Sequence, residues 1–123
     1  MTVKEIITRL SELSPTTKLR CFDQFGNMYT SIFDVESWRG SYDMPASLVY
    51  SITDLDQCTQ PAEAISNLQE CEGVKVCGYK GGEYILREDS TLFLVGDYST
   101  AGDAVGIKEI YRDGYMVLES NMS

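Results

Sequence analysis

The sequence predicts an α+β fold in which an antiparallel β-sheet of about six or seven strands carries two short helices on one face. Two segments place apolar residues at helical spacing, and several short runs are rich in β-branched and aromatic residues. Polar or glycine-containing turns separate these runs. All 123 residues are expected to form a single domain, which can bury about two-thirds of the surface of the unfolded chain.

The first helix is predicted from about Val3 to Leu13. Thr2 and Glu5 have the spacing of a capping box, in which each side chain accepts a hydrogen bond from the other residue's backbone N–H. Ser14-Pro15 ends the helix, because the residue before proline is disfavoured in the α region. One face of this helix is apolar, formed by Val3, Ile6, Ile7, Leu10 and Leu13.

The second helix is predicted from Pro61 to about Cys71, with Thr59 or Gln60 as its cap. Proline is tolerated in the first turn, where its missing N–H has no intrahelical partner. Gly73 is expected to stop the helix. Its apolar stripe consists of Ala64, Ile65 and Leu68.

Three hairpins are predicted from pairs of strand-like runs around turn signals. Residues 18–22 and 28–33 flank Gly26-Asn27, residues 84–87 and 91–95 flank Glu88-Asp89-Ser90, and residues 104–111 and 115–118 flank Asp113-Gly114. A further strand is expected at 48–52. The segments 53–60 and 96–102 are predicted to be connections, 34–45 an ordered loop, and 74–76 is too short to assign.

Charge and composition exclude several functions. Nineteen acidic and ten basic residues give a net charge of -9, which repels nucleic acid and acidic membrane surfaces. No apolar run approaches the ~20 residues that span a bilayer, and the N-terminal residues do not resemble a signal peptide, so we expect a cytosolic protein. The chain has no histidine, and its cysteines lack zinc-site spacing and are expected to be free thiols: Cys21, Cys58, Cys71 and Cys77.

Two clusters combine a cation, aromatic rings and glycine in this acidic chain. The Trp38 cluster contains Trp38, Arg39, Gly40 and Tyr42, and the Tyr79 cluster contains Tyr79, Lys80, Gly81 and Gly82. A tryptophan ring can stack on a planar base, and a guanidinium can bind a phosphate or carboxylate through two hydrogen bonds. Glycine allows close approach of a ligand to the backbone. These eight residues are the predicted binding site for a small anionic, nucleotide-like ligand.

Each cluster also has a structural interpretation. Trp38 can anchor a loop while Arg39 pairs with Glu36 or Asp43, and the Tyr79 cluster can be a glycine turn that leads into a strand. At least one of Gly81 and Gly82 is predicted at positive φ. An open site on one subunit would bind weakly, so tight capture favours a homo-oligomer. The sequence shows no catalytic signature, and we expect a binding protein without a catalytic residue, metal ion or cofactor.

Four segments of the chain carry a resemblance to known proteins: Met1–Ile7, Ser37–Tyr42 followed by Pro45-Ala46 and Tyr50, Gly78–Tyr84, and Asp89–Leu92. On these segments the chain resembles a family of small proteins encoded by tailed bacteriophages. The likeness spans most of the chain and departs from the family at 53–58 and after Gly114.

This resemblance implies an accessory protein made in the cytoplasm of the infected bacterial host. Small acidic proteins of such phages often counter host defence by sequestering a nucleotide-derived signal molecule. The alternative function is a protein–protein inhibitor of a host defence complex, and an acidic mimic of nucleic acid is one form that such an inhibitor takes.

Overall fold

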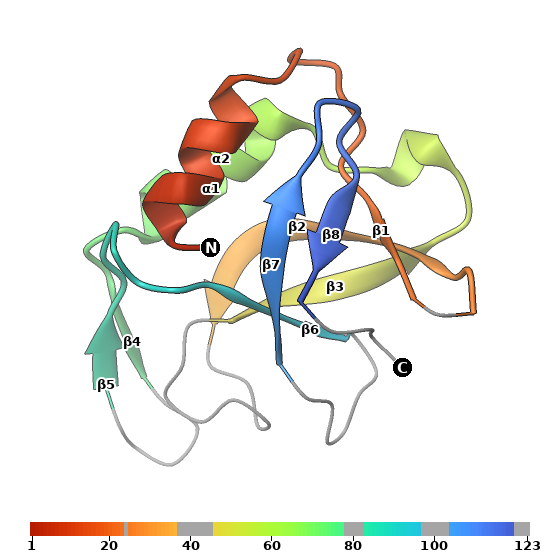
Figure 1. The fold of residues 1–123 in the computed structure, drawn as a ribbon. Coiled ribbons are helices and arrows are strands. Elements are labelled where there is room, and N and C mark those ends of the chain that lie inside the picture. The colour runs from red at the N-terminus through yellow and green to blue at the C-terminus, as the bar shows by residue number, and fades with distance from the viewer. Residues whose placement is uncertain (24, 37–45, 78–82, 97–103, 120–123) are drawn as a thin grey trace.

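The computed structural model describes residues 1–23, 25–36, 46–77, 83–96 and 104–119. These residues form two α-helices, one 3-10 helix and eight strands (Figure 1), so the predicted α+β class is confirmed. The helices are α1 (Val3–Ser11) and α2 (Pro61–Cys71), and Leu55–Gln57 form the 3-10 helix. The strands are β1 (Cys21–Phe22), β2 (Met28–Glu36), β3 (Ala46–Ile52), β4 (Lys75–Cys77), β5 (Glu83–Ile85), β6 (Phe93–Gly96), β7 (Val105–Ile110) and β8 (Met116–Leu118).

Six of these strands form one sheet in the order β1-β2-β3-β6-β7-β8, in agreement with the predicted count. Neighbouring strands are antiparallel except β3 and β6, which run parallel. The chain between them, with α2 and the β4–β5 hairpin, supplies the long crossover that a parallel pair needs. The two edge strands approach each other at a bridge between Arg20 and Tyr115. Backbone hydrogen bonds of 3.1 Å from Arg20 N to the Gly114 carbonyl and 2.9 Å from Met116 N to the Arg20 carbonyl make the sheet nearly a closed barrel.

Two of the three predicted hairpins are present. β1 pairs with β2, and β7 pairs with β8 around Gly114, whose φ of 89° is the left-handed conformation that an Asp-Gly turn provides. The third prediction, that 84–87 pairs with 91–95, is wrong. β5 pairs with β4, whereas β6 lies between β3 and β7.

The turn at Glu88–Ser90 has a different role, because it caps α1. The first N–H groups of a helix need acceptors from outside the helix. Val3 N donates to the Ser90 carbonyl and Lys4 N to the Glu88 carbonyl, both at 2.9 Å. The predicted capping box of Thr2 and Glu5 supplies the remaining bonds. The turn at Glu88–Ser90 thus provides backbone acceptors for the N-terminus of α1, although the two segments are far apart in the sequence.

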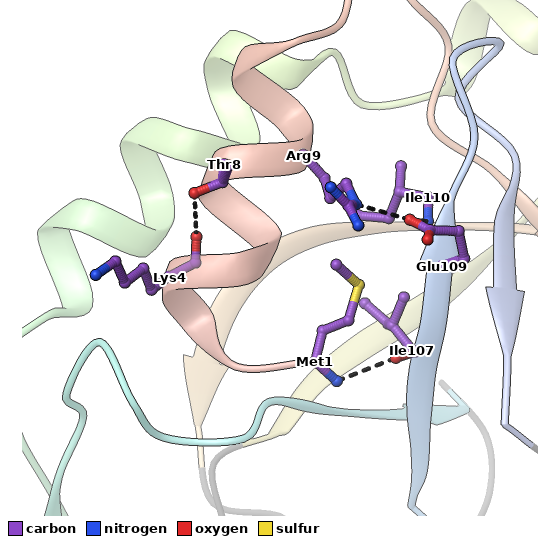
Figure 2. A network of polar contacts seen from close by, with 7 residues as sticks. All are labelled: Met1, Lys4, Thr8, Arg9, Ile107, Glu109 and Ile110. Carbon is purple, nitrogen blue, oxygen red and sulfur yellow. Dashed lines mark hydrogen bonds and ion pairs between the residues drawn. The ribbon is translucent and has the colours of Figure 1, made fainter.

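Polar contacts fix α1 to β7 (Figure 2). Arg9 Nε lies 2.8 Å from Glu109 Oε1, which also accepts a 3.0 Å hydrogen bond from Ile110 N. The amino group of Met1 donates to the Ile107 carbonyl at 3.0 Å. On its other side α1 packs against α2, which lies on β2. The two helices are therefore on the same side of the sheet (Figure 1).

The core lies between the helices and the inner face of the barrel. Phe33 is its largest completely buried side chain. Phe33 also has a φ of 57°, at a point where the register between β2 and β3 shifts. Helices, sheet and connecting segments all contribute to this core, for example through Ile6, Leu10, Val49, Leu68, Leu86, Leu94, Ile107 and Met116.

The segment 53–60, predicted as a connection, is more ordered than a linker. Asp54 and Gln57 form a capping box around the 3-10 helix. Thr59, at the end of this segment, is bonded to the barrel. Thr59 N donates at 3.1 Å to Thr30 Oγ1, and the Thr30 hydroxyl donates to the Leu19 carbonyl at 2.9 Å. These buried polar groups satisfy one another and stabilise the start of β1.

Candidate functional site

The residues predicted to bind a ligand lie outside the described part of the chain. Trp38, Arg39, Gly40 and Tyr42 fall in 37–45, and Tyr79, Lys80, Gly81 and Gly82 fall in 78–82. The predicted positive φ at Gly81 or Gly82 lies there too. The described residues that flank each cluster show what kind of element holds its ends.

The Trp38 cluster is flanked by two central strands of the barrel. Glu36 pairs with Ala46, and Ala46 pairs on its other side with Phe93 of β6. Val35 and Ala46 are both buried. Because Ala46 is paired on both sides and Glu36 is paired with it, the two ends of this cluster are fixed relative to the core.

The Tyr79 cluster is flanked by a different kind of element. Cys77 pairs with Glu83 at the end of a two-stranded hairpin that, among the described strands, forms a separate sheet from the barrel. Hairpins of two strands have little independent stability. The two clusters are thus connected to scaffolds of unequal rigidity.

The described residues also form an aromatic surface that the sequence did not predict. We call it the seam cluster, and it consists of Arg20, Phe22, Tyr111 and Tyr115 at the junction of β1 and β8. The ring centroids of Phe22 and Tyr115 are 5.7 Å apart, and those of Tyr111 and Tyr115 are 6.3 Å apart. Phe22 and Tyr111 are exposed at 38% and 53%.

Arg20 in the seam cluster is already occupied by the protein. Its guanidinium carbon lies 5.9 Å from the centre of the Tyr115 ring, and Nη2 lies 3.3 Å from Asp113 Oδ2. Nη1 donates to the carbonyls of Asp113 and Lys18. A backbone hydrogen bond from Tyr115, together with the nearby Arg20 charge, lowers the pKa of Asp113. Arg20 therefore stabilises the closure of the barrel more than it offers a site to an anion.

Beside β1, the loop 23–27 presents Phe25, which is 74% exposed. The Asp23 carboxylate accepts hydrogen bonds from Phe25 N at 2.8 Å, from Asn27 N and Nδ2 at 2.9 Å, and from the Tyr29 hydroxyl at 3.0 Å. Desolvation raises the pKa of Asp23, but these hydrogen bonds outweigh it and lower the pKa overall. An exposed phenylalanine on a well-bonded loop can be buried by a partner at a small entropic cost.

Acid is expected to destabilise this loop through Asp23. A lowered folded-state pKa means that the stabilisation is fully present above the ordinary value of 3.8 and is lost as the pH falls through the folded-state pKa. Asp23→Asn should be less stable than the wild type at pH 7, and the difference should shrink below about pH 4. Urea unfolding between pH 7 and pH 2.5 measures this.

The exposed Asp89→Asn is the matched control for the loss of one carboxylate. A difference between Asp23→Asn and the wild type that stayed constant across this pH range would contradict the role assigned to Asp23.

Among the side chains that the structure describes, the thiols of Cys21, Cys58 and Cys71 do not form a reactive or metal-binding group. The side chain of Cys77, also predicted to be a free thiol, lies outside the described part of the chain. Cys21 and Cys58 are buried and Cys71 is half-buried, and all three are free. Burial raises the pKa of Cys21 to about 12 and also raises the pKa of Cys58 and Cys71. A thiol with a raised pKa is a weak nucleophile and a poor metal ligand at neutral pH. No group of three or more Cys, Asp or Glu residues in the described ranges is placed to hold a metal ion.

Comparison with known proteins gave no match to a family model, to a curated protein or to a solved structure. Within the described residues, neither helix has the length and hydropathy needed to span a membrane.

Sequence reasoning missed the seam cluster because its members come from opposite ends of the chain. Arg20 and Phe22 belong to a predicted strand, and Tyr111 and Tyr115 flank a predicted turn. The signal that could have indicated this cluster was the presence of three aromatic residues, Phe22, Tyr111 and Tyr115, in or beside predicted turns, where aromatic rings are unfavourably exposed to water. Without the barrel closure, nothing in the sequence placed them together.

Proposed function

We propose that this chain is a bacteriophage accessory protein that binds a small anionic, nucleotide-like molecule and thereby counters a defence system of the bacterial host, in the host cytoplasm. The observation that carries the proposal is the pair of cation-aromatic-glycine clusters in a chain of net charge -9. Cations placed next to aromatic rings can bind one small anionic ligand. A long polyanion would be repelled by the acidic remainder of the protein.

The chemistry divides between the two clusters. Trp38 stacks on the base, and the Arg39 guanidinium forms paired hydrogen bonds to a phosphate. Lys80 adds a second positive charge, and Gly81 and Gly82 let the backbone approach the ligand. The pairing of Glu36 with Ala46 supports this assignment, because it gives the Trp38 cluster fixed ends.

The expected affinity indicates that the ligand must be enclosed. Two charge-assisted hydrogen bonds and one stacked ring supply roughly 4–9 kcal/mol, whereas micromolar binding already needs about 8 kcal/mol. An open site would therefore release the ligand too readily to sequester it. A homo-oligomer in which a second subunit covers the site would provide this enclosure.

A second candidate function is inhibition of a host defence protein through a protein–protein interface. The specific observations in its favour are the exposed side chain of Phe25 and the exposed rings of the seam cluster. Aromatic residues are enriched at the energetic centres of interfaces. The acidic balance of the chain would favour a basic partner surface.

Isothermal titration calorimetry with cyclic and ADP-ribose-type nucleotides tests the leading proposal. The wild type is expected to bind one of these nucleotides, and Arg39→Ala and Lys80→Ala are each expected to weaken binding by about 10-fold to 100-fold, which corresponds to one lost charge-assisted hydrogen bond. Arg112→Ala is the matched control, since Arg112 is an exposed cation on the β7–β8 turn.

The same variants separate the two candidates. If no nucleotide binds, or if Arg39→Ala and Lys80→Ala bind as the wild type does, ligand sequestration is excluded. A stoichiometric host partner that is captured by the wild type and by Arg39→Ala, but lost in Phe25→Ser, would favour the inhibitor.

A further inference from the structure

A charged turn and an aromatic cluster are neighbours on the barrel. The turn, which we call the Leu55 turn, consists of Asp54, Leu55 and Asp56 at the start of the 3-10 helix. The Leu55 side chain is 48% exposed, and both aspartates are exposed beside it. The neighbouring element is the seam cluster, with Arg112 exposed in the β7–β8 turn between its two tyrosines. Each element combines an exposed apolar surface with charge, which is acidic in the turn and basic beside the cluster.

Residues 19 and 20 join the two elements. Leu19 forms a β-bridge with Thr59, which follows the 3-10 helix, and Arg20 forms one with Tyr115 of the seam cluster. Figure 1 shows the 3-10 helix, in yellow-green, and the β7–β8 turn, in blue, in the upper part of the view. A surface that covers one of these elements can therefore reach the other.

The Leu55 turn has a fixed shape. Asp54 Oδ1 accepts a 2.9 Å hydrogen bond from Asp56 N. Gln57 Oε1 reaches back over the turn and accepts hydrogen bonds from Thr53 N at 2.6 Å and from Asp54 N at 3.2 Å. Because the turn is already ordered, a partner that buries Leu55 pays little conformational entropy.

Both elements also carry a charged side chain without an opposite charge beside it. Neither the Asp56 carboxylate nor the Arg112 guanidinium forms an ion pair with another described side chain, whereas Arg20 is paired with Asp113. Two copies of a chain with a net charge of -9 repel each other at long range. Association of two copies is therefore favoured where a cation of one copy meets an acid of the other.

We propose that the Leu55 turn of one copy of this chain packs on the seam cluster of a second copy, which makes the same contact in return. Leu55 packs on the exposed rings of the seam cluster, and Asp56 forms an ion pair with Arg112 of the partner subunit. A two-fold axis relates the two contacts. The dimer then covers three exposed apolar side chains of each copy, namely Phe22, Leu55 and Tyr111.

A second copy is the occupant because this chain carries both halves of the contact. Another protein would have to supply an acidic, apolar turn and a basic, aromatic surface at the same separation. Because the two halves are neighbours in each copy, two copies that face each other close both contacts at once. The symmetric arrangement leaves neither half open, so it gives a dimer and not a fibre.

The dimer is expected to be weak and reversible. Three exposed side chains per copy form a small area compared with the ~1,200–2,000 Å² of stable complexes, so dissociation should be measurable at micromolar or higher concentrations. The dimer does not depend on nucleotide binding. Since it covers the seam cluster, a host protein that bound there would compete with dimerisation.

Sedimentation equilibrium of the full chain, without any ligand, tests the proposal by an exchange of charges. The wild type should shift from monomer to dimer as its concentration rises. Asp56→Arg and Arg112→Glu each place like charges at both contacts of the dimer, and each should raise the dissociation constant by about tenfold. The double variant Asp56→Arg/Arg112→Glu restores opposite charges and the net charge of -9, so its dissociation constant should return to within about threefold of the wild type.

Two control variants separate the contact from general effects of charge and hydrophobicity. Lys4→Glu changes the net charge as Arg112→Glu does, but the Lys4 side chain on α1 points away from β7 (Figure 2), so this variant should dimerise nearly as the wild type does. Leu55→Ser should raise the dissociation constant by about tenfold. Val74→Ser should not, although Val74 is 50% exposed.

Urea unfolding of each variant establishes that it is folded at the temperature of the sedimentation measurement. The proposal is overturned if the wild type remains monomeric to about 1 mM, or if the single variants dimerise as it does. A double variant that dimerises no better than the single variants also overturns it. Because no nucleotide is present, these outcomes are independent of whether the chain binds one.

Discussion

Gly114→Ala is expected to destabilise the protein by about 3 kcal/mol or more, a large effect for the addition of one methyl group. Gly114 has a φ of 89°, where any residue with a Cβ is strained. The added Cβ would also lie 2.7 Å from Thr17 Cγ2 and 2.9 Å from the Lys18 carbonyl carbon, and it would clash with the Lys18 carbonyl oxygen. Because two of these contacts are with backbone, a side-chain rotation cannot relieve them.

The clash is costly because it occurs where the barrel closes. The Gly114 carbonyl accepts the hydrogen bond from Arg20 N that joins β8 to β1. Moving Gly114 away from Lys18 would lengthen this bond and separate the rings of Phe22 and Tyr115. Strain in the turn therefore spreads to the seam between the two edge strands.

Thermal and urea unfolding of Gly114→Ala and Gly26→Ala measure the two contributions separately. Gly26 has a similar φ of 83°, but a Cβ built there meets no atom within 4 Å. Gly26→Ala should therefore show the conformational cost alone, about 1 kcal/mol. Equal losses of stability in the two variants would show that the contact with Thr17 and Lys18 does not matter.

The sequence predicted those parts of the fold that depend on neighbouring residues. The capping box of Thr2 and Glu5, the proline at the start of α2 and the Asp113-Gly114 turn are all local signals, and each is present in the structure. A capping residue or a turn glycine acts within a few positions of itself. Its effect can therefore be read without knowing the rest of the fold.

The parts that the sequence did not predict depend on distant segments. The parallel pairing of β3 with β6 and the bridge from Arg20 to Tyr115 join residues that no local pattern relates. The turn at Glu88–Ser90 had the composition of a hairpin, but its carbonyls are used by α1. For the candidate site, the sequence identified two chemically suitable clusters, and the geometry of the flanking strands adds fixed ends to the Trp38 cluster.

The positive φ of Phe33 within β2 is a structural feature that its sequence context does not suggest, and it can be tested by mutation. Its aromatic side chain is completely buried at a backbone φ of 57°, and both polar groups of the peptide that precedes it are hydrogen-bonded. Phe33 N donates to Ser31 Oγ at 3.1 Å, and Asn67 Nδ2 of α2 donates to the Ile32 carbonyl at 2.6 Å. Phe33→Ala is expected to cost about 3–5 kcal/mol through the cavity that it leaves.

Glycine at the same position should reverse a usual order of stability. In an extended strand, a glycine variant is less stable than the alanine variant by roughly 0.5–1 kcal/mol. At positive φ, glycine avoids a cost of about 1–2 kcal/mol that alanine keeps. Phe33→Gly should therefore be at least as stable as Phe33→Ala, although it removes one more carbon atom from the core.

Urea unfolding of four variants decides the question, with Val49 as the matched position. Val49 is completely buried on the neighbouring strand β3, and among the described residues Phe33 is the one non-glycine residue at positive φ. Val49→Gly should be less stable than Val49→Ala, whereas the pair at Phe33 should show no such loss or the opposite order. The same loss from alanine to glycine at both positions would mean that the backbone at Phe33 is not held in the left-handed region in solution.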